Sequence, residues 1–123
     1  MIMIHQMQQI FLNIVLNAYQ AMTSGGVLGI SSSLTTKNDV EYVRVEISDT
    51  GSGIPSQILE KIFTPFYTTK AQGTGLGLPI CSKLVKLHNG NITVASNDTS
   101  GTVFTVDLPS YYPESIDPFE VTA

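Results

Sequence analysis

The segment Gly73-Thr74-Gly75-Leu76-Gly77-Leu78 has a glycine at every second position and runs directly into an amphipathic helical pattern. Because glycine has no side chain, the backbone of such a segment can approach a ligand closely. The helix that follows would aim its unpaired N–H groups and the positive end of its dipole at the same place. The segment therefore predicts a phosphate-binding loop, with a plain glycine-rich turn as the alternative.

Two common phosphate loops do not fit this segment. A P-loop ends in Gly-Lys-Ser/Thr, and the sequence contains no Gly-Lys pair. A dinucleotide fingerprint has the spacing Gly-x-Gly-x-x-Gly directly after a strand, whereas this segment reads Gly-x-Gly-x-Gly and residues 63–72 do not have a strand pattern. A phosphate site here belongs to another fold.

Length and composition indicate one compact domain, which we place at residues 1–109, followed by an acidic tail at 110–123. The chain has 123 residues, of which 42% are hydrophobic and 13% charged, and its net charge is −4 without a basic tract, so we expect no nucleic-acid partner. No apolar run approaches the roughly 18 residues of a membrane span, so we expect no membrane contact. The single cysteine, Cys81, favours a reducing, cytoplasmic location.

Hydrophobic periodicity predicts three helices, at 6–22, 55–62 and 75–88, of which the first is expected to be buried nearly all round. Period-two patterns predict four strands, at 27–34, 40–48, 91–96 and 102–108, with a hairpin turn at Lys37-Asn38-Asp39 between the first two. This order predicts an α+β fold, a two-layer sandwich in which about three helices cover one face of a mixed, mostly antiparallel sheet.

Asn13 and Asn17 are four residues apart, so they share one face of the first predicted helix. A buried amide without partners costs about 1–3 kcal/mol, so two of them in an apolar helix need an explanation. Either they bond to neighbouring backbone, or their oxygens, which are hard ligands, face a Mg²⁺ ion carried by a nucleotide. Gln20 continues the same polar stripe.

Asp49 has the same strand parity as Val45 and Ile47, so its carboxylate is predicted to point to the apolar side. A charge in that place needs hydrogen-bond donors. An adenine amino group or the backbone N–H groups of residues 50–53 could supply them, and an aspartate that caps its own turn is the competing interpretation. Gly51 and Gly53 would keep this wall thin enough for a planar base.

Two further residues are candidates for the same pocket. Thr102 shares the inward parity of Phe104, so its hydroxyl would enter from another strand, although threonine is also an ordinary strand former. Lys70 ends the aromatic segment Phe63-Thr-Pro-Phe-Tyr-Thr-Thr-Lys70, which has the features of a mobile lid. It could bring a cation over the phosphates, or it could be an ordinary surface lysine.

Five motifs, in this order, resemble the catalytic and ATP-binding domain of sensor histidine kinases, a member of the GHKL superfamily that also includes gyrase, Hsp90 and mismatch-repair ATPases. They are Asn13-Ile-Val-Leu-Asn17-Ala18, Asp49-Thr-Gly-Ser-Gly-Ile-Pro55, Ile62-Phe-Thr-Pro-Phe-Tyr-Thr-Thr-Lys70, Gly73-Thr-Gly-Leu-Gly-Leu78 and Gly101-Thr102. The third looks like the nitrogen-regulation type of kinase. The resemblance covers about residues 6–109 and implies a Bergerat-type ATP-binding fold.

The resemblance also implies roles. Asn17, assisted by Asn13, would coordinate Mg²⁺; Asp49 would accept the adenine amino group, with Thr102 supporting it through water; and Lys70 would contact the γ-phosphate. Asn13 and Lys70 are the implied catalytic residues. The implied nucleotide-binding residues are Asn13, Asn17, Gln20, Asp49, Gly51, Gly53, Ile54, Lys70, Gly73, Thr74, Gly75, Leu76, Gly77, Leu78 and Thr102.

The sequence departs from the family at two of these positions. Many members have Lys or Arg where Gln20 stands, and gyrase-type ATPases have a general-base Glu where Asn13 stands. Transfer of the γ-phosphate to an external histidine therefore fits better than hydrolysis, and the resemblance implies ATP or ADP, a dimerisation and phosphotransfer domain and a downstream response regulator as partners.

His5 and His88 do not lie in a phosphoacceptor context, so we expect no autophosphorylation by this domain alone. An anti-sigma-factor-type serine kinase and a non-catalytic nucleotide-gated interaction module are the alternative functions. The expected cytoplasmic location applies to this domain and leaves open a membrane anchor elsewhere in the parent kinase.

Overall fold

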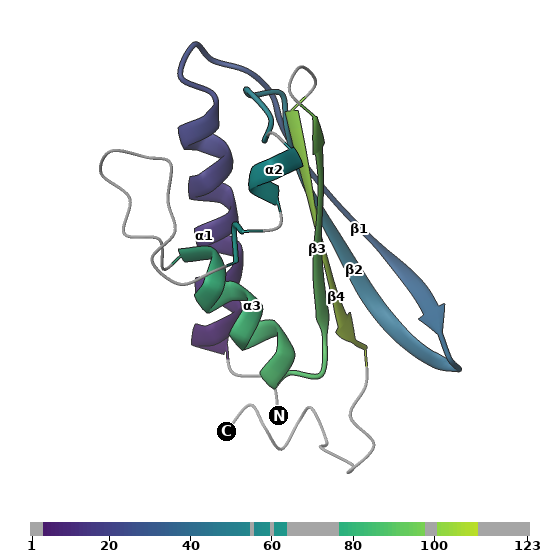
Figure 1. Ribbon diagram of the computed structural model, residues 1–123. Coiled ribbons are helices and arrows are strands. Elements are labelled where there is room, and N and C mark those ends of the chain that lie inside the picture. Colours follow the sequence, from purple (N-terminus) through teal and green to yellow (C-terminus); the bar gives the residue numbers. More distant parts are fainter. Residues whose placement is uncertain (1–3, 55, 60, 64–76, 98–100, 111–123) are drawn as a thin grey trace.

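The computed structural model describes residues 4–54, 56–59, 61–63, 77–97 and 101–110. Its elements follow one another in the order α1 (Ile4–Ala21), β1 (Leu28–Lys37), β2 (Val40–Asp49), α2 (Ser56–Leu59), α3 (Gly77–Leu87), β3 (Asn91–Asn97) and β4 (Gly101–Pro109). The three helices lie on one side of a four-stranded sheet, with α1 and α3 packed against each other (Figure 1). The predicted α+β fold is confirmed.

The sheet has the strand order β1-β2-β4-β3, and each of its pairings is antiparallel. The β1–β2 hairpin closes through Asn38 and Asp39, whose φ angles are 51° and 65°. Two consecutive residues with positive φ form the type of two-residue turn whose twist matches a hairpin, and Asn and Asp tolerate that conformation. The predicted hairpin turn is therefore present.

The core lies between the sheet and the helices. Ile10 and Ile14 of α1 and Val85 of α3 are fully buried against inward-facing strand residues such as Phe104 and Ile47. The end of α3 is fixed locally: Asn89 has φ 61°, and the N–H of Gly90 donates to the carbonyl of Val85 at 2.9 Å. A left-handed residue followed by a bond back into the last turn is a usual helix stop.

The prediction that α1 is buried nearly all round is wrong. Leu12, Leu16 and Tyr19 are 57%, 45% and 73% exposed, because among the described elements α1 packs mainly on β2 and α3 and these residues lie on the opposite side of the helix. The helix side of β1 is also uncovered, with Ile30 and Leu34 exposed. The predicted helix at 55–62 is shorter, since α2 is a single turn. Within the described residues, no helix has the length and hydropathy that a membrane crossing requires.

A buried carboxylate ties the sheet together on the face away from the helices. Asp107 of β4 is 2% exposed and pairs with Arg44 of β2 at 2.9 Å and with Lys37 of β1 at 2.8 Å. The hydrogen bond from Arg44 is the main reason that the pKa of Asp107 lies below its usual value, with Lys37 adding to the effect against the cost of burial. Three of the four strands are therefore joined by one side-chain cluster.

Candidate functional site

A row of three polar side chains crosses the sheet at one end, on the face that carries the helices. Asp49 of β2 lies directly opposite Thr102 of β4, and Thr102 lies opposite Ser96 of β3. Asp49 and Thr102 are only 5% and 3% exposed. Since the other buried residues on this face are apolar, a polar row at the sheet's end marks the place where a ligand can find hydrogen-bond partners.

One carboxylate oxygen of Asp49 makes a hydrogen bond within the protein. Oδ1 accepts the N–H of Gly51 at 2.8 Å, which is the turn-capping interaction that competes with ligand binding. Within the described part of the chain, Oδ2 has no hydrogen-bond partner. The carboxylate can therefore cap its turn and still offer a second acceptor to a ligand.

The loop after β2 leans against the end of α1. The N–H of Ser52 donates to the carbonyl of Ala21 at 3.3 Å, and a Cβ at Gly51 would overlap that carbonyl. Gly53 has φ 75°, a conformation that favours glycine, and so redirects the chain toward Ile54. At Gly51, therefore, the absence of a side chain allows the loop to pack closely against the end of α1, a role that the sequence did not suggest.

Ser96 is a member of this site that the sequence analysis missed. Its Oγ accepts the N–H of Ile54 at 2.7 Å and lies 2.9 Å from both the carbonyl of Gly101 and the hydroxyl of Thr102. It thus joins the glycine-containing loop to β3 and β4. The available signal was its parity, because Ser96 continues the inward series of Ile92 and Val94 with a polar side chain.

The predicted residues of α1 form a polar stripe beside α3. Asn13 and Asn17 are half-buried and Gln20 is exposed. The side-chain amide of Asn13 donates to the carbonyl of Gly77 at 3.4 Å, which links α1 to the first residue of α3. Asn13 therefore lies next to the point where the glycine motif enters its helix.

Cys81 of α3 lies in the interface between α3 and α1. It is fully buried, and its Sγ donates to the carbonyl of Ile10 at 3.4 Å. Burial raises the pKa of its thiol to about 11, against a smaller lowering by a hydrogen bond from Asn13. The thiol is therefore protonated at neutral pH and takes a packing role.

Part of the predicted site lies outside the described residues, namely Lys70, Gly73, Thr74, Gly75 and Leu76. Of the same motif, Gly77 is exposed with open space around it, and Leu78 packs against the core. The tail predicted at 110–123 also lies outside, except for Ser110, whose N–H donates to the carbonyl of Glu41 at 3.0 Å. The division between domain and tail stays a prediction.

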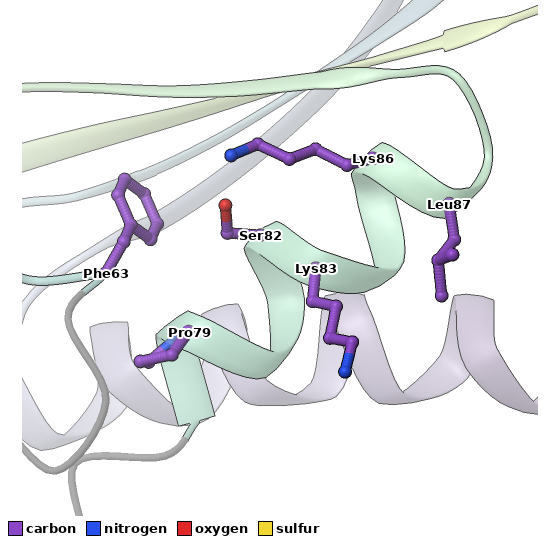
Figure 2. Close-up of a pocket in the computed structure, with 6 residues that line it drawn as sticks. All are labelled: Phe63, Pro79, Ser82, Lys83, Lys86 and Leu87. Carbon is purple, nitrogen blue, oxygen red and sulfur yellow. The ribbon is translucent and has the colours of Figure 1, made fainter.

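A cavity of about 470 Å³ opens on the outer side of α3, and Figure 2 shows the side chains around it. It is lined by Phe63, Pro79, Ser82, Lys83, Lys86 and Leu87. None of these belongs to the predicted nucleotide site. The candidate site is therefore defined by the polar row and the polar stripe rather than by this hollow.

Comparison with known proteins decides the family. Residues 4–112 match the model of the histidine kinase-, DNA gyrase B- and HSP90-like ATPases. The chain belongs to this ATPase family. As a member of the histidine kinase-, DNA gyrase B- and HSP90-like ATPases, it is similar to sporulation kinase C of Bacillus subtilis, with 43% identity over 85% of this chain and 24% of that protein. It is 41% identical to the sensor histidine kinase ZraS of Escherichia coli, over 85% of this chain and 22% of ZraS.

Solved structures place this ATPase domain within the same group. The catalytic domain of the histidine kinase ThkA aligns with a TM-score of 0.72 and 40% identity, over 85% of this chain and 66% of that one. Full-length ShkA in complex with AMPPNP aligns with a TM-score of 0.67 and 30% identity, over 85% of this chain and 21% of that one. The chain is a histidine kinase-type catalytic ATPase domain, and it spans about a quarter of the length of the curated relatives that it matches.

Proposed function

We propose that this domain binds ATP with its base at the Asp49 end of the sheet and transfers the γ-phosphate to a histidine on a separate dimerisation and phosphotransfer domain. The observation that carries the proposal is the buried pair Asp49–Thr102, with one carboxylate oxygen free of partners among the described residues. The ShkA complex with AMPPNP, an analogue of ATP, supports the choice of nucleotide. ADP would leave the same site as product.

The base would be recognised by a carboxylate and held by a thin wall. Oδ2 of Asp49 accepts a hydrogen from the adenine amino group, and Thr102 supports the same edge through water. The backbone from Gly51 to Ile54 lines the base. A hydrogen bond to a charged acceptor contributes about 1.5–3 kcal/mol, enough to discriminate between bases.

The phosphates would extend from the base toward α1 and the start of α3. Gly73–Leu78 supplies backbone N–H groups to phosphate at a helix N-terminus, and Lys70 supplies a cation to the γ-phosphate. Gln20, exposed on the same stripe as the asparagines, would make a polar contact to the phosphates but carries no charge. Lys70 therefore carries more of the electrostatic stabilisation of the transferred group.

The residues of α1 fit a bound Mg²⁺ ion by the chemistry of their donors. Asn13 uses its amide nitrogen toward Gly77, which leaves its oxygen as the end available to a cation. Amide oxygens are hard ligands, and Mg²⁺ usually takes one or two protein ligands together with phosphate oxygens and water. Asn17, assisted by Asn13, would hold the ion, which neutralises charge on the phosphates when bound.

The acceptor histidine is expected on another domain. His88 is 5% exposed and its Nδ1 lies 2.8 Å from the carbonyl of Leu84, so it is not available to a nucleotide. His5 is exposed at the start of α1, outside any phosphoacceptor context. We expect a cytoplasmic domain that does not phosphorylate itself and whose parent kinase passes the phosphoryl group to a response regulator.

Nucleotide titration tests the site. Asp49→Asn should weaken ATP binding in Mg²⁺ at least tenfold by calorimetry, because it replaces an acceptor by a group that also presents donors. Glu46→Gln is the matched control, since Glu46 is exposed on the other face of the same strand, and it should bind as the parent does. Unchanged affinity in Asp49→Asn would show that the base lies elsewhere.

Phosphoryl transfer is tested with labelled ATP, Mg²⁺ and a histidine-bearing dimerisation domain. Acid-labile, base-stable label on that domain supports the proposal. Acid-stable label on serine would instead indicate a serine kinase of the anti-sigma-factor type. Tight ATP binding without any label would favour a nucleotide-gated interaction module.

A further inference from the structure

Ser96 joins three separate parts of the proposed base pocket through one oxygen atom. Its Oγ contacts the N–H of Ile54 at 2.7 Å, the carbonyl of Gly101 at 2.9 Å and the hydroxyl of Thr102 at 2.9 Å. The first partner belongs to the loop after Asp49, and the other two belong to β4. Ser96 is therefore a polar link between this loop and β4.

Counting hydrogens at this oxygen fixes the direction of each bond. A serine hydroxyl has one hydrogen to donate and two lone pairs to accept with. The N–H of Ile54 can only donate, so it takes one lone pair, and the carbonyl of Gly101 can only accept, so it takes the hydrogen of Ser96. The remaining lone pair of Ser96 must then receive the hydrogen of Thr102, which satisfies all three contacts at once.

The consequence lies at Thr102. With its hydrogen committed to Ser96, its oxygen presents only lone pairs to the pocket. Asp49, directly opposite in the neighbouring strand, also presents only acceptors. Both buried side chains at this edge therefore act as hydrogen-bond acceptors and need donors from the ligand or from water.

We propose that Ser96 is a positioning residue that holds Thr102 as a hydrogen-bond acceptor and thereby sets the preference of the pocket for a 6-amino over a 6-oxo purine nucleotide. The inference rests on the proposed adenine site at Asp49. Adenine offers two amino hydrogens at position 6, whereas a 6-oxo purine offers an acceptor there and a single N–H at the adjacent N1, so it would leave one of the two buried acceptors without a hydrogen. A site built to bond with a ligand hydrogen discriminates strongly against an analogue that lacks it.

Competing titrations with ATP and inosine triphosphate test the proposal, since the two nucleotides differ only in the group at position 6 and in the hydrogen on the adjacent N1. Ser96→Ala frees the Thr102 hydroxyl to turn and donate, so the ratio of ATP to inosine triphosphate affinity should fall about tenfold, the equivalent of one hydrogen bond. Ser96→Thr retains the hydroxyl, and its ratio should stay within about twofold of the parent. Thr93→Ala, exposed on the other face of β3, is the matched control and should leave the ratio unchanged.

A merely structural serine would give a different result. If Ser96→Ala weakens both nucleotides equally and leaves the ratio unchanged, the inference is overturned. Thr102→Val provides the second test where Ser96→Ala does not fold. It removes the acceptor while keeping the branched shape, so its ratio should also fall, and an unchanged ratio would overturn the inference.

The Asp49→Asn variant separates the two proposals. If it binds both nucleotides as the parent does, the adenine site itself is wrong and the role of Ser96 falls with it. If it weakens ATP binding while Ser96→Ala and Thr102→Val keep the parental ratio, only the role of Ser96 is wrong.

Discussion

The side-chain amide of Asn13 donates a hydrogen bond to the carbonyl of Gly77 at 3.4 Å and so connects the middle of α1 with the first residue of α3. Because the amide nitrogen is used in this way, the orientation of the whole side chain is set and its oxygen is directed elsewhere. The asparagine motif and the glycine motif, which are far apart in the sequence, are thus in direct contact.

Removal of this side chain should affect nucleotide binding more than folding. Asn13→Ala loses both the link to Gly77 and the oxygen proposed for the metal, so we expect ATP affinity in Mg²⁺ to fall about tenfold or more, the equivalent of one or two hydrogen bonds. Gln8→Ala, exposed elsewhere on α1, is the control. Calorimetry with and without Mg²⁺ measures the effect, and parental affinity in Asn13→Ala would remove this residue from the site.

A side chain at Gly101 should destabilise the fold through a steric clash, and a comparison with Gly25 separates this clash from backbone strain. Gly101 and Gly25 have nearly equal φ angles of 87° and 88°, but a Cβ at Gly101 would overlap the carbonyl of Asp49, whereas nothing lies within 4 Å at Gly25. Gly25→Ala should therefore cost only the backbone strain of about 1–2 kcal/mol. Gly101→Ala should cost clearly more, about 3 kcal/mol or above, in urea unfolding. Equal decreases in the free energy of unfolding for the two variants would show that the backbone at this end of the sheet can shift to accommodate the added methyl group.

Asp107 should stabilise the fold in a manner that depends on pH. Its pKa is lowered in the folded state, chiefly by the hydrogen bond from Arg44, so its contribution is complete above the ordinary carboxyl pKa near 4 and is lost as the pH falls through the lower, folded pKa. Asp107→Asn should lower the free energy of unfolding by about 1–3 kcal/mol at pH 7 and by less near pH 3. Asp39→Asn, in the exposed turn, is the control, and a loss independent of pH would contradict the ion-pair explanation.

The thiol of Cys81 should be unreactive until the protein unfolds. Burial raises its pKa to about 11, so at pH 8 iodoacetamide should label it slowly in the native protein and rapidly in urea. A raised thiol pKa also means that the free energy of unfolding falls between about pH 9 and pH 11, by up to about 1.4 kcal/mol per unit. Cys81→Ala should lack this component of the decline. Fast labelling of the native protein would show that the α1–α3 interface opens readily.

Local patterns predicted most of the fold, because the helices, strands and the turn at Asn38-Asp39 depend on residues close in sequence. Parity alone also placed Asp49 and Thr102 on the inner face. It could not place them opposite one another, since the register of β2 against β4 is decided by the packing of the whole sheet. Ser96 was overlooked because a serine before a turn is common, and its role depends on an oxygen shared between Thr102 of the same hairpin and Ile54, which lies 42 residues earlier in the sequence.

The exposure of Leu12 and Ile30 could not be predicted from hydrophobicity. Both residues are as apolar as those of the core, and periodicity shows which residues share a face but not whether another element covers it. The same limit applies to the face of Asn13 and Asn17, whose position beside α3 depends on how two helices pack.

The position of β4 between β2 and β3 has a consequence for the order of events during synthesis. Asp49 leaves the ribosome long before Thr102, and until β4 inserts, the carboxylate has no strand beside it on that side. Before β4 is made, the pairing of Asp49 with Thr102 that the proposed base site needs does not exist. An interior strand of the described sheet thus follows the other three strands in the sequence, and the side chains of the proposed base site come together only when β4 takes its place between β2 and β3.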